Sequence, residues 1–429
     1  MLLHYRKNRA KKLNIVVEPS QRCGKLHFGY LVVAALVLTS FIPLSLGLSC
    51  AGIFYPEVSS DLGVGKGLLS YYTSILWLSA MVFLPLMGRL FNEHDARLCL
   101  TGAVTIIAVA FIWLSFTRSL WQFYAGAFAM GIGVGMLLFL APSTLINRWF
   151  AKRCGFLLGI VMAFTGVGGV VWSTVGGALI HAVGWSTTYL IFAMLSAATI
   201  PATLLMVSSH PRDKGLQPYG YQPNSVDSSG QAALEGIGAS EAFKMPVFFL
   251  LLAMCLLLNF GMYIYFMIPS YISTLPLAIG MPLLGATASS VAMAGQTVSK
   301  LVLGYVGDKQ PHLSTLAGIV LGMGGVIMLF LGSETAILIY VAAFIYGVFY
   351  GITNVMTPIL TRNSFGNKDY PKIYSRVSMA ASIGSMASGF IWGALIDVTG
   401  SFTVMFVGVT AIMAVTGLIV LLIQKYQRP

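Results

Sequence analysis

The chain has 429 residues, of which 57% are hydrophobic and 9% are charged. An ordinary soluble domain carries about 25% charged residues, so this composition excludes one. The 25 Lys and Arg against 13 Asp and Glu give a net charge of +12. Such a charge would suit a nucleic-acid binder, but the positions of the basic residues, described below, exclude that class.

Apolar runs of about 20 residues recur along the whole chain, which is the length a helix needs to cross about 30 Å of hydrocarbon. Transmembrane β-barrels show short alternating segments instead. The sequence therefore predicts an all-α, polytopic membrane protein with twelve transmembrane helices. The predicted spans are 28–53, 68–91, 98–117, 119–145, 154–182, 187–208, 247–272, 283–304, 313–332, 335–360, 374–398 and 402–424.

The predicted spans form two bundles that a polar segment joins. This segment is rich in Pro, Gly and Ser, a composition that cannot bury a core, and it is predicted to be a flexible cytoplasmic linker. The basic N-terminal tail is either solvated and disordered or in contact with anionic lipid. The predicted divisions are a basic tail at 1–27, an N-terminal six-helix bundle at 28–208, the linker at 209–245, a C-terminal six-helix bundle at 246–424 and a tail at 425–429.

The basic residues follow the positive-inside rule. If both termini are cytoplasmic, all but three of the 25 Lys and Arg lie on the cytoplasmic side. The exceptions are Lys66 and Arg118 on the outer side and Lys300 inside the eighth span. This asymmetry predicts the topology and accounts for the positive net charge without a nucleic acid.

The two halves of the chain repeat at an offset of 216 residues. Features of the second, fourth and fifth spans recur in the eighth, tenth and eleventh. The matched positions are Gly88 and Gly304, Pro142 and Pro358, Asn147 and Asn363, Lys152 and Lys368, and the Gly-Ala-Leu-Ile segments that begin at Gly177 and Gly393. One constant offset predicts two pseudo-symmetric halves, each with a fourth helix bent at proline.

A turn motif closes the eighth span on the cytoplasmic side. It reads Gly304-x-x-x-Asp308-Lys309, where the first half has Gly88 and Asn92. The glycine lets two helices approach, and the carboxylate can cap the N-terminus of a neighbouring helix, so that the motif acts as a latch. The alternative is an ordinary polar turn.

Two parallel six-helix halves and this turn motif resemble the major facilitator superfamily over the full length of the chain. Segment 147–159 (NRWFAKRCGFLLG) is similar to the oxalate:formate antiporter family and its monocarboxylate-porter relatives. Segments 242–248 (AFKMPVF) and 259–261 (NFG) also match that branch.

The resemblance also implies a substrate site. In those families a basic residue, usually arginine, stands eight residues before the signature aspartate and binds the substrate carboxylate, and Lys300 stands eight residues before Asp308. Lysine offers a point charge instead of a planar fork. The eleventh span has small residues around Ser382 where oxalate carriers hold a second cation. A monoanion is therefore expected in place of a dicarboxylate.

Lys300 is the formally charged residue that the sequence places inside a span, and such a charge marks a functional site unless its stem snorkels to the interface. Snorkelling stays open, because Asp308 lies roughly 12 Å along the helix at 1.5 Å per residue. Gln296, one turn deeper, is either a hydrogen-bonding or a packing residue. By the resemblance, Tyr346 and Tyr350 line the cavity, with core or lipid-facing packing as the alternative.

Further candidate residues have side chains that suit either a cavity or a helix interface. Those placed in the cavity are Asn259, Asn354, Phe139 and Tyr72. Asn147 and Arg148 are placed at the cytoplasmic mouth, where a role in gating and a role in anchoring predict the same residue types.

The sequence therefore predicts a plasma-membrane secondary transporter that moves a small organic anion, a monocarboxylate, by alternating access with exchange or proton coupling. The alternatives are a transporter of a neutral or amphipathic solute, with Lys300 only snorkelling, and a non-transporting membrane sensor. No nucleophile–base set or metal cluster appears and the five cysteines are scattered, so no enzyme, cofactor or metal is expected. The expected partners are the organic anion and the lipid bilayer, with the protein as a monomer.

Overall fold

The computed structural model describes residues 27–64, 66–220, 236–272, 274–281, 284–332 and 334–427. Within these residues the regular structure is helical, with two isolated β-bridges and no strand. The all-α prediction is confirmed. The predicted basic tail, apart from His27, lies outside the described residues, as do 221–235 of the predicted linker and the last two residues of the C-terminal tail.

The N-terminal half begins with a first span that is interrupted by a π-helical turn containing Pro43. A second π-helical turn directly precedes Pro142 in the predicted fourth span. The elements are α2 (Phe28–Thr39), η1 (Ser40–Leu44), α3 (Ser45–Ser49), α4 (Ala51–Leu62), α5 (Lys66–Glu93), α6 (Ala96–Ser115), α7 (Leu120–Gly135), η2 (Met136–Leu140), α8 (Ala141–Trp149), α9 (Cys154–Ala197) and α10 (Ile200–Met206).

The linker and the C-terminal half follow. Pro358 lies inside the long helix α17, whereas Pro142 lies at the start of α8. The elements are η3 (Pro211–Lys214), α11 (Ala239–Ala242), α12 (Pro246–Gly261), α13 (Ile264–Ile272), α14 (Leu277–Gly280), α15 (Leu284–Gly307), α16 (Pro311–Leu331), α17 (Ala336–Phe365), α18 (Tyr370–Thr399) and α19 (Thr403–Gln427).

Ten helical stretches in the described residues are long and apolar enough to cross a membrane. One of them, residues 154–206, covers the fifth predicted span and all but the last two residues of the sixth, and its backbone breaks at Gly184, where φ is 81° and ψ is 162°. Helix α15 covers residues 284–304 of the eighth predicted span but is not among the ten, because Gln296 and Lys300 lower its hydropathy. Each of the twelve predicted spans therefore falls on helix.

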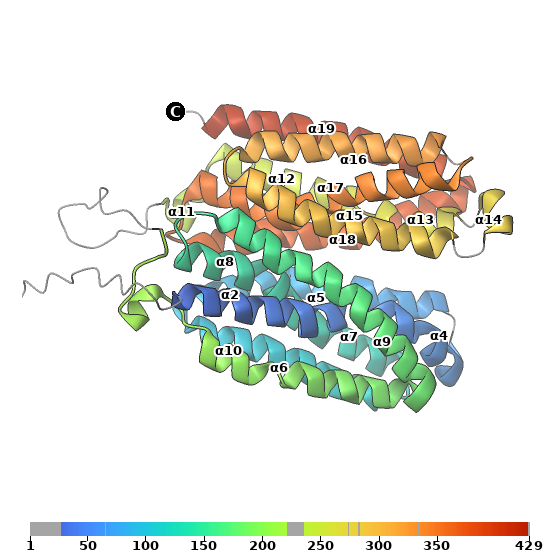
Figure 1. The fold of residues 1–429 in the computed structure, drawn as a ribbon, viewed down its shortest axis with the longest axis horizontal. Helices are drawn as coiled ribbons and strands as arrows, with labels where there is room; N and C mark the ends of the chain where they lie inside the picture. Colours follow the sequence, from blue (N-terminus) through green and yellow to red (C-terminus); the bar gives the residue numbers. More distant parts are fainter. Residues whose placement is uncertain are drawn as a thin grey trace, which may run out of the picture.

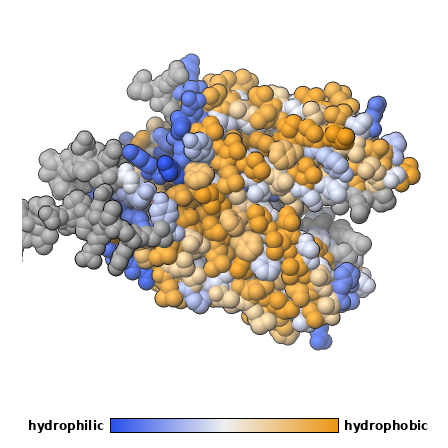
Figure 2. All heavy atoms as spheres, viewed as in Figure 1, coloured by the Kyte–Doolittle hydropathy of each residue, from blue (hydrophilic) through white to orange (hydrophobic). Residues whose placement is uncertain are grey.

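The two halves lie side by side, with the N-terminal half in blue to green and the C-terminal half in yellow to red (Figure 1). Hydrophobic side chains cover most of the middle of the face shown in Figure 2, away from its two ends. Examples that are 74% to 80% exposed are Trp121, Leu205 and Ile337. Such an extensive apolar surface suits lipid and would be unfavourable in water.

Contacts between the halves recur at the 216-residue offset. A Cβ atom built on Gly304 of α15 would lie 2.4 Å from the carbonyl oxygen of Gly155, at the start of α9. A Cβ atom on Gly88 of α5 would lie 2.6 Å from the carbonyl oxygen of Pro371, at the start of α18. Positions 88 and 304, and 155 and 371, are each separated by 216 residues. The second and eleventh predicted spans therefore pack together as the eighth and fifth do.

The described ends of the linker lie against equivalent loops of the two halves. The Tyr219 amide donates to the Trp149 carbonyl at 2.8 Å, and the Ile237 amide donates to the Phe365 carbonyl at 2.9 Å. Both contacts lie at the end of the molecule where α15 ends and α9 begins. We call this end, with Asp308, Arg153 and Arg362, the basic end.

Candidate functional site

Helix α15 is held between two neighbours at backbone distance. A Cβ atom on Gly159 of α9 would lie 2.2 Å from the carbonyl oxygen of Lys300, and one on Gly347 of α17 would lie 2.3 Å from that of Ala292. Real Cβ contacts do not come this close, so only glycine fits at these two positions. One neighbour belongs to the N-terminal half and the other to the helix's own half, which places α15 at the junction between them.

Lys300 is buried at this junction, with 1% of its surface exposed. Its ammonium donates to the Thr165 hydroxyl at 2.9 Å and to the Met162 carbonyl at 3.2 Å, both on α9. The same nitrogen lies 5.6 Å from the centre of the Tyr350 ring. The side chain therefore extends across to the other half and does not snorkel to the interface. No carboxylate pairs with Lys300 within the described part of the chain.

Gln296 lies one turn from Lys300 and belongs to the same polar cluster. Its Nε2 donates to the Tyr265 hydroxyl at 2.8 Å, while its buried Oε1 has no partner in the described residues. The rings of Tyr265 and Tyr350 lie 4.7 Å apart, and Tyr350 also faces Lys300. We call Lys300, Gln296, Tyr350, Tyr265 and Thr165 the junction cluster. It offers a cation, an unpaired amide oxygen and three hydroxyl groups.

Two members of the junction cluster, Tyr265 and Thr165, were not predicted from the sequence. Thr165 precedes the Gly166-x-Gly168 segment, which marks a close-packed helix but gives no sign of a partner 135 residues away. Tyr265 lies in an apolar span among several aromatic residues. Only the packing of α13 and α9 against α15 singles them out.

Tyr346 and Asn259 lie in the internal packing of the C-terminal half. The Tyr346 hydroxyl donates to the Gly261 carbonyl at 2.9 Å, and its ring is fully buried. The Asn259 amide donates to the Cys255 carbonyl at 2.8 Å and accepts from the Ser385 hydroxyl at 3.4 Å. In this conformation both side chains join helices of one half and do not contact Lys300.

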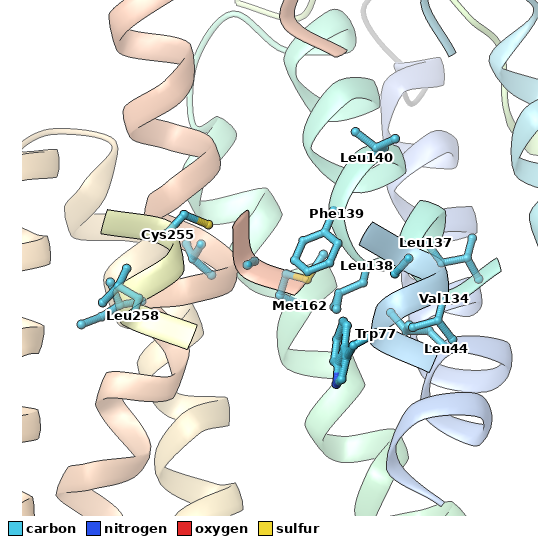
Figure 3. Packing of buried hydrophobic residues seen from close by; sticks show 14 of the residues in the cluster. Leu44, Trp77, Val134, Leu137, Leu138, Phe139, Leu140, Met162, Cys255 and Leu258 are labelled. Atoms are coloured by element: carbon cyan, nitrogen blue, oxygen red, sulfur yellow. The ribbon is translucent and has the colours of Figure 1, made fainter. Parts of the chain in front are cut away.

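Of the remaining cavity candidates, two pack within the N-terminal half and one lies one helical turn from the junction cluster. The Phe139 ring is 4% exposed and lies 6.2 Å from that of Trp77, in the core of the N-terminal half (Figure 3). Tyr72 is 3% exposed and packs 5.1 Å from Phe123 in the same half. Asn354 is half-buried on α17, one turn beyond Tyr350.

Asp308 caps the first turn of α9 across the boundary between the halves. Its two carboxylate oxygens accept from the backbone amides of Gly155 at 2.6 Å and Phe156 at 3.0 Å. A carboxylate on free amides at a helix N-terminus is favourable both as a cap and through the helix dipole. Lys309 turns away and lies over the Tyr305 ring at 5.1 Å. The carboxylate therefore has the geometry expected of a latch.

The turn after the second predicted span, which is equivalent to the Asp308 turn, contacts the other half through different groups. Asn92 donates to the Asp369 carboxylate at 3.5 Å, and Glu93 pairs with Lys372 at 3.2 Å. The pair is partly exposed, and such surface pairs contribute about 0–1 kcal/mol. The close approach of Gly88 to α18 is kept, whereas the helix-capping carboxylate is not.

A cavity of about 620 Å³ lies between the halves at the basic end. Asn147, Arg153, Asp308 and Arg362 are among the residues that line it. Arg148 does not line the cavity, because its guanidinium donates to the Phe91 carbonyl at 3.1 Å inside the N-terminal half. The structure therefore places Asn147 at this mouth and Arg148 behind it.

Comparisons with known proteins agree with this architecture. A family profile described as Major Facilitator Superfamily matches residues 37–365 and 282–429. Monocarboxylate transporter 12 of Xenopus laevis is 22% identical over 83% of this chain and 80% of its own. Monocarboxylate transporter 12-B of Danio rerio is 21% identical over 88% and 83%, and the MFS-type transporter pynF of Aspergillus niger is 24% identical over 65% and 60%.

Proposed function

The chain belongs to the major facilitator superfamily, a family of membrane transporters, and on this premise we propose that it moves a small organic anion, a monocarboxylate, by alternating access. The observation that carries the proposal is the position of Lys300. Its ammonium is buried between the halves, and in the described residues it has neutral oxygen atoms and a ring face for neighbours but no carboxylate. A substrate carboxylate would supply the missing counter-charge.

The chemistry of the junction cluster favours a monoanion. One cation neutralises one carboxylate, and a charge-assisted hydrogen bond is roughly twice as strong as a neutral one. Gln296, one turn away on α15, and Tyr350 of α17, whose ring faces the ammonium, add hydrogen-bonding groups beside Lys300. The names of two of the relatives, both monocarboxylate transporters, support the same substrate class.

A neutral or amphipathic solute is the weaker proposal. This alternative assumes that the Lys300 side chain reaches the membrane–water interface. Instead, the ammonium donates to Thr165 and Met162 inside the protein. Transport of a lone anion into a negative interior costs about 2.3 kcal/mol per 100 mV. Exchange for another anion, or entry together with a proton, removes that cost, and we propose one of these couplings.

The basic end is proposed to be cytoplasmic, in a plasma membrane. In a cysteine-free background, Arg118→Cys should react with an impermeant maleimide on intact cells, and Lys368→Cys should react only after permeabilisation. Both side chains are exposed, so accessibility within the protein does not confound the comparison. Reaction of Lys368→Cys on intact cells would contradict this orientation.

The substrate class is tested with purified protein. Acetate, lactate and pyruvate should raise the melting temperature, because a ligand at 100 times its Kd stabilises a protein by about 2.7 kcal/mol. The same acids should be taken up into proteoliposomes. The uncharged amides of these acids should neither raise the melting temperature nor be taken up. Equal stabilisation and equal uptake of acids and amides would contradict an anion site.

A further inference from the structure

A groove lies between helices α12 and α19 at the basic end, with α19 at the edge of the molecule farthest from the N-terminal half (Figure 1). Its volume is about 530 Å³, within the range of about 300–1,000 Å³ that is typical of ligand pockets. The residues that line it are Lys244, Pro246, Phe249, Leu250, Leu422 and Tyr426. Phe249 and Tyr426 are 59% and 58% exposed, so the groove is accessible from the surrounding lipid.

Positive charge lies at the end of this groove nearest the water. Lys244 directly precedes α12, Lys425 is in the last turn of α19, and both side chains are exposed. Within the described residues neither lysine pairs with a carboxylate, although Glu241 lies three positions before Lys244. Helix α12, which begins at Pro246, has no side-chain cap at its N-terminus. The positive end of its dipole therefore adds to the two cations, and such a helix start favours a phosphate.

The turn that carries Lys244 is fixed to the start of α18. The Ala239 amide donates to the Asp369 carboxylate at 3.0 Å. The Arg376 guanidinium lies 3.8 Å from the centre of the Phe243 ring, directly before Lys244. The backbone therefore holds the lysine at the groove before any ligand arrives, and less conformational entropy is lost on binding.

The equivalent place in the N-terminal half is covered by the chain itself. The 216-residue offset pairs Phe28, the first residue of α2, with Lys244. Lys214 of the linker lies over the Phe28 ring at 5.1 Å, and the His27 side chain caps α2 by accepting from the Gly29 amide at 3.2 Å. The start of α12 has no such side-chain cap, so only the first of the two equivalent helix starts is provided for internally.

We propose that the groove between α12 and α19 binds an anionic phospholipid from the leaflet at the basic end. The headgroup phosphate would lie against Lys244 and the start of α12, with an acyl chain along Phe249 and Leu422. Basic pockets between transmembrane helices bind anionic headgroups in this way. The basic N-terminal tail does not suit the groove, because it has the same sign of charge as Lys244 and Lys425. The inference is independent of the transported solute, since the groove contains no residue of the junction cluster.

The experiment measures lipid binding beside the groove. Leu418, one turn deeper than Leu422 on α19, is 61% exposed and does not line the groove. In a cysteine-free background, Leu418→Cys is labelled with bimane and reconstituted in phosphatidylcholine vesicles that contain increasing fractions of a spin-labelled lipid. Spin-labelled phosphatidylglycerol should quench the bimane at an about fivefold lower fraction than spin-labelled phosphatidylcholine, which corresponds to about 1 kcal/mol.

Three variants locate this preference. Lys244→Gln should reduce it to less than about twofold, and Lys244→Arg should keep it, because the charge is kept. Lys368→Gln is the matched control, since it lowers the net charge by the same amount at an exposed position of the basic end that does not line the groove. It should retain the parental preference.

The results that would overturn the inference are equally definite. Equal quenching by the two lipids in the parental protein would mean that bulk lipid or another part of the chain occupies the groove. An unchanged preference in Lys244→Gln would exclude the lysine as the headgroup ligand. Equal losses in Lys244→Gln and Lys368→Gln would show only a general attraction of anionic lipid to the basic end.

Discussion

Replacement of Lys300 by glutamine is expected to lower the affinity for a carboxylate by about 10³-fold. The variant leaves the substrate carboxylate in a buried site without its counter-charge, and breaking a buried ion pair costs about 3–5 kcal/mol. About 1.4 kcal/mol corresponds to a factor of ten. The measurement is concentration-dependent uptake of a labelled monocarboxylate into proteoliposomes, with folding checked by gel filtration.

Two further variants test whether the loss comes from the missing charge at position 300. Lys300→Arg keeps the charge and should retain partial activity with altered substrate preference, because guanidinium and ammonium groups differ in donor geometry. Lys368→Gln removes a charge from an exposed side chain at the basic end and should transport like the parent. A folded Lys300→Gln protein with parental affinity would show that the lysine is not the counter-charge.

Gly159→Ala is expected to prevent the close approach of α9 and α15 and to lower transport at least tenfold. The new Cβ would lie 2.2 Å from the carbonyl oxygen of Lys300, a backbone atom that cannot rotate away. Overpacking of this kind typically costs about 1–3 kcal/mol. The contact joins the two halves, so the cost falls on their approach and not on the packing within either half. Alanine favours helix over glycine by about 1 kcal/mol, so helix propensity cannot explain a loss.

Gly177→Ala is the matched control on the same helix. Apart from its chain neighbours and the backbone of its own helix, a Cβ atom at Gly177 would have no described heavy atom within 4 Å. This variant should therefore transport normally. A cysteine at Asn363, which lines the cavity at the basic end, should react faster with a maleimide when Gly159 is replaced. Parental transport and parental labelling in Gly159→Ala would show that this approach is not part of the cycle.

The helix-capping contact of Asp308 has a local signal in the sequence. A carboxylate four residues after a glycine, at the end of a span, can cap the N-terminus of a neighbouring helix. This property can be recognised without knowing which helix is the neighbour. The repeat offset then pairs position 88 with 304 and position 155 with 371, and the contacts of Gly88 and Gly304 follow those pairs. Similarly, the composition of α15 marked Lys300 and Gln296 as unusual before any partner was known.

The sequence by itself determined the helical membrane architecture, the twofold repeat and the unusual charge at position 300. These properties depend on hydropathy and spacing along the chain and require no knowledge of which helices contact each other. Only the tertiary structure decided that Lys300 donates to Thr165, that Tyr265 binds Gln296, and that Tyr346 turns into its own half. A helix's periodicity identifies its polar positions but not the helix opposite them, because that partner is fixed by close packing between residues that here lie 31 to 135 positions apart in the chain.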